Sequence, residues 1–247
     1  MKIGIISDIH GNLPSLEAVL NAFDERGVDT IVCLGDLVGY FHQSLEVLNL
    51  IMNSDIVTIL GNHEAYMLGI LDCSIANWSA YNLDYVKRSI PPRVLEWLQG
   101  LPRELFMTVE DLNLAFFHGS PWRPLEGYVY PDSTSLSRFT QLSYDFVFLG
   151  HTHYQMVKTR RNTTIINPGS CGLPRDGGHC ASAAIVYVGN DVQIELLHIE
   201  YDVDSFILST REKNVNRDAL EKLSAFTVEN ASKDRKRFND IISLKTE

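Results

Sequence analysis

The 247-residue sequence predicts an α/β fold, and two observations lead to that prediction. Over the first 60 residues, short apolar runs alternate with amphipathic stretches of helical period, which is typical of a parallel sheet with helices packed against it. After residue 103, short strand-like runs follow one another with turns such as Gly189-Asn190 between them, which indicates hairpins and a second sheet.

The first predicted strand is the apolar run from Lys2 to Ser7. A helix follows it, because Asn12 can cap a helix N-terminus and Gly27 is a typical stop after the last apolar position. The apolar side chains at helical spacing are Leu13, Leu16, Leu20 and Phe23. The next predicted elements are a strand at 30–34, a helix at 44–52 and a strand at 56–60.

The remaining elements are predicted from the same patterns. Residues 64–100 look helical, with a break at Pro91-Pro92, and the chain is helical in composition again from about Asp202. Residues 228–247 are charged and weakly periodic, which predicts partial disorder. Because no repeat or linker is visible, we predict one domain over 1–247 with a C-terminal helical tail from about 202. Later strands are predicted at 104–109, 113–117, 145–149, 154–159, 163–167, 182–188 and 192–198.

Composition excludes several classes of partner. With 21 basic and 31 acidic residues, the net charge of −10 argues against broad nucleic-acid binding through a basic face. No apolar run approaches the roughly 18 residues of a membrane span, and the N-terminus looks like a strand, not a signal peptide. The cysteines show no CxxC spacing, so we expect a reduced, cytoplasmic protein without membrane contact. They are Cys33, Cys73, Cys171 and Cys180.

Polar side chains follow five of the predicted strands at the points where the strands end. In open α/β sheets, ligands bind outside the carboxyl ends of the strands. A cap, a turn or a packed histidine would explain any one of these residues, but five of the eight histidines standing at strand ends is poorly explained by chance. The segments are Asp8-Ile9-His10, Gly35-Asp36-Leu37-Val38-Gly39, Gly61-Asn62-His63-Glu64, His118-Gly119 and Gly150-His151-Thr152-His153.

The chemistry of this set suits a pair of metal ions. Imidazole and carboxylate together favour Mn, Fe, Zn or Ni over Mg or Ca. The lack of cysteine among the candidates disfavours a structural zinc site. Two ions held about 3.5–4 Å apart need a group that can bridge them, and a carboxylate can do so.

The ordered motifs Asp-x-His, Gly-Asp-x-x-Gly, Gly-Asn-His-Glu, His-Gly and Gly-His-x-His, from Asp8 to His153, resemble the calcineurin-like metallophosphoesterase superfamily. Two later segments, Asn167-Pro168-Gly169-Ser170 and Pro174-Arg175-Asp176-Gly177, are similar to its small single-domain branch, the YfcE-type phosphodiesterases. The resemblance implies a four-layered α/β sandwich, in which two facing mixed β-sheets are flanked by helices.

The resemblance also implies roles for single residues. His63 corresponds to the histidine that stands beside the metals without binding them. Asn12 and Arg175 are weaker candidates, for contacting substrate or for holding a ligand loop. The metal ligands it implies are Asp8, His10 and His153 for a first ion, Asn62, His118 and His151 for a second, and Asp36 as the bridge.

The implied activity is hydrolysis of phosphodiesters, or of phosphomonoesters, by a hydroxide formed from metal-bound water. Two divalent ions, with manganese as first choice and iron, zinc or nickel as alternatives, would neutralise the phosphoryl oxygens and lower the pKa of that water. His63, when protonated, would donate to the leaving oxygen as a general acid. The expected substrate is a small phosphorylated molecule, such as a nucleotide.

Three other functions on the same fold stay open. Dinucleoside polyphosphate hydrolases and phosphoprotein phosphatases usually carry arginines near the metals, and residues 35–40 here contain none. A non-catalytic interaction scaffold would fit a site that had lost ligands, whereas this sequence keeps all of them. One loop, Phe41-His42, departs from the usual Gly-Pro of the branch, and its role, the natural substrate and the oligomeric state are not fixed by the sequence.

Overall fold

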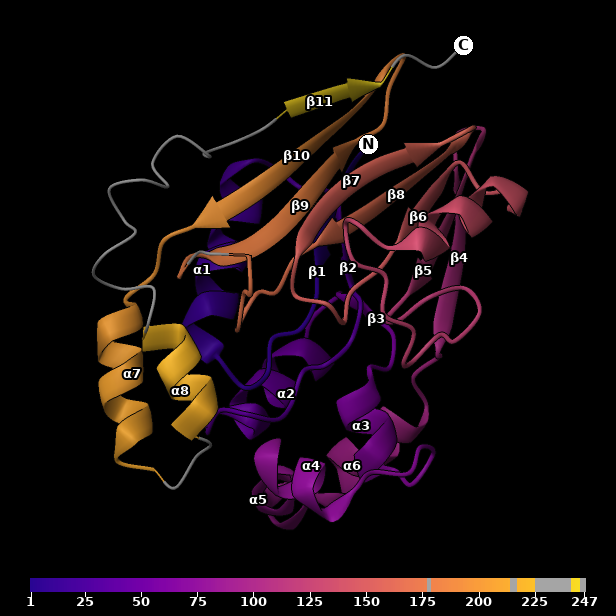
Figure 1. Cartoon of the computed structure of the whole chain (residues 1–247). Helices are drawn as coiled ribbons and strands as arrows, with labels where there is room; N and C mark the ends of the chain where they lie inside the picture. The colour runs from indigo at the N-terminus through magenta and orange to yellow at the C-terminus, as the bar shows by residue number, and fades with distance from the viewer. Residues whose placement is uncertain (177–178, 214–216, 225–240, 245–247) are drawn as a thin grey trace.

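A computed structural model describes residues 1–176, 179–213, 217–224 and 241–244. Two β-sheets form its centre (Figure 1). The first has the order β11-β10-β9-β1-β2-β3 and the second the order β4-β5-β6-β8-β7. The strands of the first sheet are β1 (Lys2–Ile6), β2 (Thr30–Cys33), β3 (Val57–Thr58), β9 (Ala181–Tyr187), β10 (Val192–Ile199) and β11 (Ile241–Leu244). Those of the second are β4 (Glu104–Val109), β5 (Leu112–Phe117), β6 (Phe146–Phe148), β7 (Gln155–Arg160) and β8 (Thr163–Pro168).

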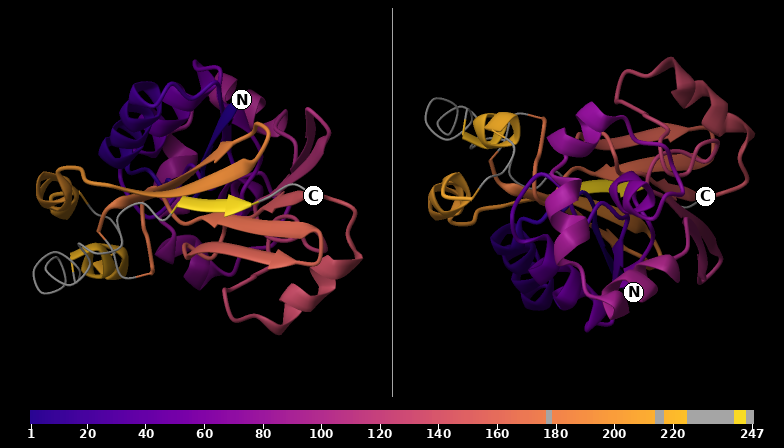
Figure 2. Two further views of the ribbon diagram at one scale, coloured as in Figure 1. Left: turned by 90° about the horizontal axis from the view of Figure 1, so that it is seen from above. Right: turned by 90° about the horizontal axis from the view of Figure 1, so that it is seen from below.

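The helices cover the outer faces and the lower end of the sheets. Helix α1 packs against the first sheet, where Gly4 of β1 makes room: a Cβ there would lie 2.6 Å from the ring of Phe23. Helices α7 and α8 stand together to one side in both views of Figure 2. The helices are α1 (Leu13–Glu25), α2 (Ser44–Met52), α3 (Asn62–Met67), α4 (Ile75–Ala80), α5 (Leu83–Ser89), α6 (Pro92–Gln99), α7 (Val203–Arg211) and α8 (Arg217–Ser224).

The main core lies between the two sheets. Ile3 and Ile5 of β1 share one buried cluster with Phe116 of β5 and Phe148 of β6, whose rings stack at 4.6 Å. A second cluster lies between the first sheet and the helices around α1 and α2. On the far face of the second sheet, the 3-10 segment η1 (Thr134–Gln141) buries Leu136 and Phe139. This gives the predicted four layers, with two mixed sheets face to face.

One expectation about the sheets is wrong in detail. The strands near 182–188 and 192–198 were expected to belong to the second sheet with the other hairpins, but β9 pairs antiparallel with β1 and makes the first sheet mixed. Within 228–247, where the charged sequence predicts partial disorder, the segment Ile241–Leu244 pairs antiparallel with β10 as β11. The other residues of that expectation, 228–240 and 245–247, lie outside the described part of the chain.

The strand and helix boundaries otherwise lie close to those expected. Helix α6 begins at Pro92, where proline is tolerated, so Pro91-Pro92 does interrupt the helical stretch. No sequence pattern predicted the 3-10 segment η1. Within the described residues, no helix combines the length and apolar character that crossing a bilayer needs.

Candidate metal centre

The parallel strands of both sheets end at one edge, where turns direct polar side chains inward. Five aspartate and histidine residues of these turns have positive φ angles, which for L-residues costs roughly 1–2 kcal/mol each. Aspartate and histidine are among the residues that occupy this region most readily. The five are Asp8 (56°), His10 (53°), Asp36 (55°), His151 (65°) and His153 (62°).

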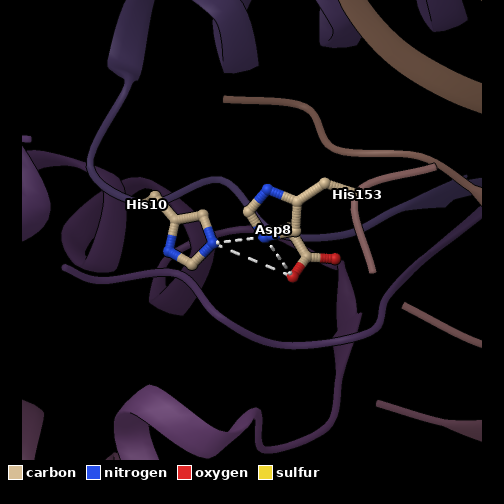
Figure 3. Close-up of side chains that lie close together, drawn as sticks. All are labelled: Asp8, His10 and His153. Carbon is tan, nitrogen blue, oxygen red and sulfur yellow. Dashed lines mark hydrogen bonds and ion pairs between the residues drawn. The ribbon is translucent and has the colours of Figure 1, made fainter. Parts of the chain in front are cut away.

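The first group of side chains is Asp8, His10 and His153 (Figure 3). Each residue offers one ligand atom, and these atoms lie within 4.8 Å of one another. Oδ1 of Asp8 lies 3.2 Å from Nε2 of His153 and 3.8 Å from Nε2 of His10. All three side chains are buried, so any cation among them would be shielded from bulk water.

The second group is Asp36, His118 and His151, which also meets the 4.8 Å limit. Nε2 of His118 lies 3.5 Å from Oδ2 of Asp36 and 3.2 Å from Nδ1 of His151. Oδ1 of Asn62, the first residue of α3, lies 2.9 Å from the same Nε2. The amide oxygen of Asn62 therefore joins this group as a fourth donor atom.

Asp36 lies between the two groups. Its Oδ2 is 3.8 Å from Nε2 of His10 and 3.5 Å from Nε2 of His118. Its Oδ1 accepts the backbone N–H of His63 at 2.9 Å, which fixes the orientation of the carboxylate. Gly61 permits this approach, since a Cβ at that position would collide with Oδ1. One oxygen of Asp36 is thus shared by both groups.

The tautomers of the histidines show that a cation fits the first group. Nδ1 of His10 lies 3.1 Å from the carbonyl oxygen of Val38, and Nδ1 of His153 lies 2.6 Å from that of Leu173. A carbonyl only accepts hydrogen bonds, so both Nδ1 atoms carry the proton and each neutral ring has a lone pair on Nε2. These Nε2 atoms face each other at 3.1 Å, beside an Asp8 Oδ1 that has no hydrogen-bond partner. A cation between them would relieve the repulsion.

In the second group, Nδ1 of His118 donates to the carbonyl oxygen of Leu34 at 2.9 Å, which again leaves the lone pair on Nε2. His151 has the opposite orientation: its Nδ1 faces the group, and its buried Nε2 has no hydrogen-bond partner. His118 thus repeats the arrangement of His10 and His153, in which a backbone carbonyl holds the outer nitrogen of a metal-binding imidazole.

Burial disfavours the charged form of three histidines of the centre. Desolvation lowers the pKa of His10, His118 and His151, and the neighbouring histidines lower the pKa of His10 further. For Asp36, burial and the nearby charges of Glu64 and Asp8 raise the pKa. Neutral imidazoles around crowded carboxylates form a site that lacks positive charge, which divalent cations would supply.

His63 lies beside both groups. Its Nδ1 is 3.0 Å from the carbonyl oxygen of Val38, and its Nε2 is 3.8 Å from Oδ2 of Asp36. A ring nitrogen of His63 also lies within 4.8 Å of ligand atoms of His10 and Asp36, so geometry alone would permit His63 to bind an ion. Burial lowers the pKa of His63 to about 3, and the ring stacks on Tyr81 with centroids 4.4 Å apart.

The two weaker candidates differ in their surroundings. Asn12 caps α1 and is fully buried, and its Nδ2 donates to the carbonyl of Gly172 and to the hydroxyl of Tyr201. Arg175 is half-buried; its Nη2 donates to the hydroxyl of Tyr40 at 3.3 Å, and its backbone N–H donates to the carbonyl of His153. The structure thus brings Arg175 to the metal-site edge, whereas Asn12 has its amide occupied by loop contacts.

Sequence reasoning missed the part played by Glu64. This buried carboxylate accepts four backbone N–H groups at 2.9–3.2 Å, and it fixes the loop that carries Asp36. The donors are Asp36, Leu37, Val38 and Gly61. Its position three residues after the N-cap Gly61 is the sequence signal that could have found it, since an acid there can accept the backbone N–H of the N-cap residue, as Glu64 does from Gly61.

Comparison with known proteins identifies the arrangement. The model of the calcineurin-like phosphoesterase superfamily domain matches residues 1–191. An uncharacterised protein of Methanocaldococcus jannaschii is 33% identical over 219 residues, which cover 81% of this chain and 88% of that protein. The phosphodiesterase YfcE of Escherichia coli is 27% identical over 198 residues, covering 78% of this chain and 89% of YfcE.

Solved structures agree with the sequence relatives. A crystal structure of a metallophosphoesterase from Sphaerobacter thermophilus superposes with a TM-score of 0.75 at 30% identity. The match covers 92% of this chain and 99% of that one. The likeness therefore extends beyond residue 191, where the match to the family model ends.

Proposed function

The chain belongs to the calcineurin-like phosphoesterase superfamily and is a metal-dependent phosphoesterase, and we propose that it hydrolyses small phosphodiesters at the Asp8–His153 edge of its two sheets. The observation that carries this proposal is Asp36, whose Oδ2 stands 3.5–3.8 Å from a histidine of each group. A single carboxylate oxygen between two ligand groups is what a two-ion phosphoesterase site requires.

The proposed ligand set follows the two groups. Asp8, His10 and His153 hold one ion. His118 and His151, with Asn62, hold the other. Asp36 bridges the two ions. When bound, the pair of divalent ions neutralises the phosphoryl oxygens of the substrate and lowers the pKa of an attacking water. The protein fixes the spacing of these ligands through backbone carbonyls and through the Glu64 carboxylate.

For His63 we propose the role of proton donor to the leaving oxygen. Its Nδ1 is held by the carbonyl of Val38, so Nε2 is the atom that faces the site. The low pKa of the buried ring would keep it neutral, but the negative charge of a bound phosphodiester favours the protonated form and raises that pKa. A positioned acid of this kind contributes about 10²–10⁴-fold.

We propose manganese as the working metal, with iron, zinc and nickel as alternatives. The donors are imidazole nitrogens, carboxylates and one amide oxygen, without thiolate, which suits this part of the first transition series. A cytoplasmic location is part of the proposal and rests on the buried thiols of Cys33 and Cys171.

A hydrolysis screen tests the proposal. Purified protein is stripped with chelator, reloaded singly with Mn²⁺, Zn²⁺, Fe²⁺ or Ni²⁺, and assayed on phosphomonoesters, phosphodiesters, nucleotides, dinucleoside polyphosphates and a phosphopeptide. We expect hydrolysis of bis-p-nitrophenyl phosphate that depends on the added metal, is highest with Mn²⁺ and exceeds that of p-nitrophenyl phosphate. Preferential cleavage of a dinucleoside polyphosphate or of the phosphopeptide would instead assign one of the two alternative hydrolase functions. No metal-dependent turnover at all would favour the scaffold.

A further inference from the structure

Two stacks of aromatic rings begin at histidines of the metal centre. On one side, Tyr81 stacks on His63 with centroids 4.4 Å apart, and Tyr66 follows at 6.2 Å with an interplanar angle of 10°. On the other side, Tyr128 stacks on His151 with centroids 3.9 Å apart, and Tyr130 lies parallel to Tyr128 at an interplanar angle of 2°, displaced to a centroid separation of 5.8 Å. The stacks come from distant parts of the chain, so the fold alone brings both to one site.

A cationic side chain lies beside one of the two stacks. Tyr40 lies edge-on to His10 at 4.7 Å and 5.4 Å from Tyr81, and its hydroxyl accepts a hydrogen bond from Arg175. Arg175 is thus tied through Tyr40 to the Tyr81 stack and to the ring of His10. Nε of Arg175 is buried without a hydrogen-bond partner, which leaves a charged donor for an anion.

Tyr128 differs from the other rings in its exposure. It lies in the loop between β5 and η1, and 51% of its surface is exposed although it stacks directly on His151. A large exposed ring beside a catalytic centre gives little stabilisation to the fold, because half of its surface stays in water.

We infer that the substrate carries a planar ring, such as a nucleobase, on the ester group that stays with the phosphate, and that this ring stacks on Tyr128 while Arg175 contacts the phosphate. This inference rests on the proposed phosphodiesterase function. The proposed proton donor His63 stacks on Tyr81, so the leaving oxygen that it protonates lies on the Tyr81 side of the centre. The retained group then lies on the opposite side, next to Tyr128. Base–aromatic stacking tolerates any base, so the inference concerns the ring and not its identity.

Two substrates with the same leaving group test the inference. Thymidine 5′-p-nitrophenyl phosphate and ethyl p-nitrophenyl phosphate both release nitrophenolate and differ only in the retained group. For the wild-type protein loaded with manganese, we expect kcat/KM to be roughly tenfold higher for the thymidine ester, mostly through KM. Equal values for the two esters would overturn the inference while leaving the phosphodiesterase function intact.

Three variants assign the preference to the ring. Tyr128→Leu should lower kcat/KM for the thymidine ester roughly tenfold and change the ethyl ester less than about twofold, whereas Tyr128→Phe should keep the preference. Tyr85→Leu is the matched control, because Tyr85 is 48% exposed on α5 and its removal should change neither ester. An equal loss on both esters in Tyr128→Leu would mean that the ring only supports His151, and would overturn the inference.

Binding measurements separate this inference from the proposed function. Calorimetric titration of metal-loaded protein with thymidine 5′-monophosphate and with ethyl phosphate requires no turnover. Tighter binding of the nucleotide that is lost in Tyr128→Leu supports stacking of the substrate ring at Tyr128, called here the ring site. If neither ester is hydrolysed while this binding difference persists, the phosphodiesterase function alone is refuted. Equal affinity for the two phosphates refutes the ring site.

Discussion

Three histidines of the centre turn their Nδ1 atoms to backbone carbonyls, and this sets which atom faces the metals. His10 uses Val38, His118 uses Leu34 and His153 uses Leu173. The carbonyls belong to residues far away in the chain, so the tautomer of each ring depends on the folded structure. His151 is the exception, since its Nδ1 faces inward and Tyr128 covers its ring.

At Asp36, a neutral amide should disrupt the centre. We expect Asp36→Asn to lower phosphodiester hydrolysis by at least about 10³-fold and to reduce the bound metal below two ions, because an amide oxygen bridges two dications poorly. Metal analysis of the purified variant together with its turnover checks this. The exposed Asp55 provides the control Asp55→Asn, which should keep both ions. Two tightly bound ions in Asp36→Asn would contradict the bridging role.

At His63, loss of the imidazole should separate chemistry from metal binding. We expect His63→Ala to keep both ions and to slow esters of basic leaving groups by about 10²–10⁴-fold, with a smaller effect on nitrophenyl esters, since nitrophenolate leaves without a proton. A leaving-group series at saturating manganese measures the difference. A uniform loss across the series would point to phosphate binding, and loss of an ion would make His63 a ligand.

At the scale of elements, helix α3 organises the site through its first turn. Asn62 and His63 face the cluster, and Glu64 ties the Asp36 loop to the helix N-terminus. Helix α7 supports the neighbouring loop: Phe41 packs edge-on against Phe206 at 5.1 Å, and Nδ1 of His42 lies 3.1 Å from the hydroxyl of Thr210. The Phe41-His42 loop thus packs on the C-terminal helices.

The Glu64 contacts predict a substitution effect on both stability and metal binding. Glu64→Gln would turn an NH₂ group toward backbone N–H donors and leave two of them unpaired, which should cost about 2–4 kcal/mol of unfolding free energy. We also expect weaker binding of metal, because the Asp36 loop loses its support. Denaturant unfolding and calorimetric titration measure these effects. Glu46 is exposed in α2, so Glu46→Gln is the control. If Glu64→Gln changes stability and metal affinity as little as Glu46→Gln does, Glu64 does not support the Asp36 loop.

At the scale of the whole molecule, the buried histidines make the metal-free protein sensitive to acid. Burial holds the pKa of His10, His63, His118 and His151 below the value near 6.5 of an unfolded chain. Below pH ~6.5 the unfolded state therefore binds more protons than the folded state, and stability falls as pH falls through that range. Asp36 and Glu64, whose pKa values are raised by burial, act in the opposite direction.

We expect the denaturation midpoint of the metal-free protein to be lower at pH 5.5 than at pH 7.5. The lowered pKa values of four histidines act against the raised pKa values of two carboxyl groups. Each proton by which the unfolded and folded states differ changes the free energy of unfolding by about 1.4 kcal/mol per pH unit. Urea unfolding of chelator-treated protein at the two pH values gives the answer. A midpoint that stays constant or rises on acidification would show that Asp36 and Glu64 outweigh the histidines.

The sequence by itself determined the residues that stand at the ends of strands. Asp8, Asp36 and His118 each follow a short apolar run, and where such a run ends is decided locally by side-chain pattern and turn residues. The same local patterns were sufficient for the strand–helix alternation that makes the first sheet. The motif resemblance then implied the four layers, which the comparison with solved structures agrees with.

Only the tertiary structure decided what depends on partners far away in the chain. β9 and β10 join the first sheet because β9 pairs with β1, a choice that the turn at Gly189-Asn190 cannot specify. Tyr128 lies over His151, and Glu64 accepts the backbone N–H of Asp36, through contacts between residues more than 20 positions apart. Periodicity shows that a side chain is buried or polar, whereas the atom it meets depends on how both sheets pack together.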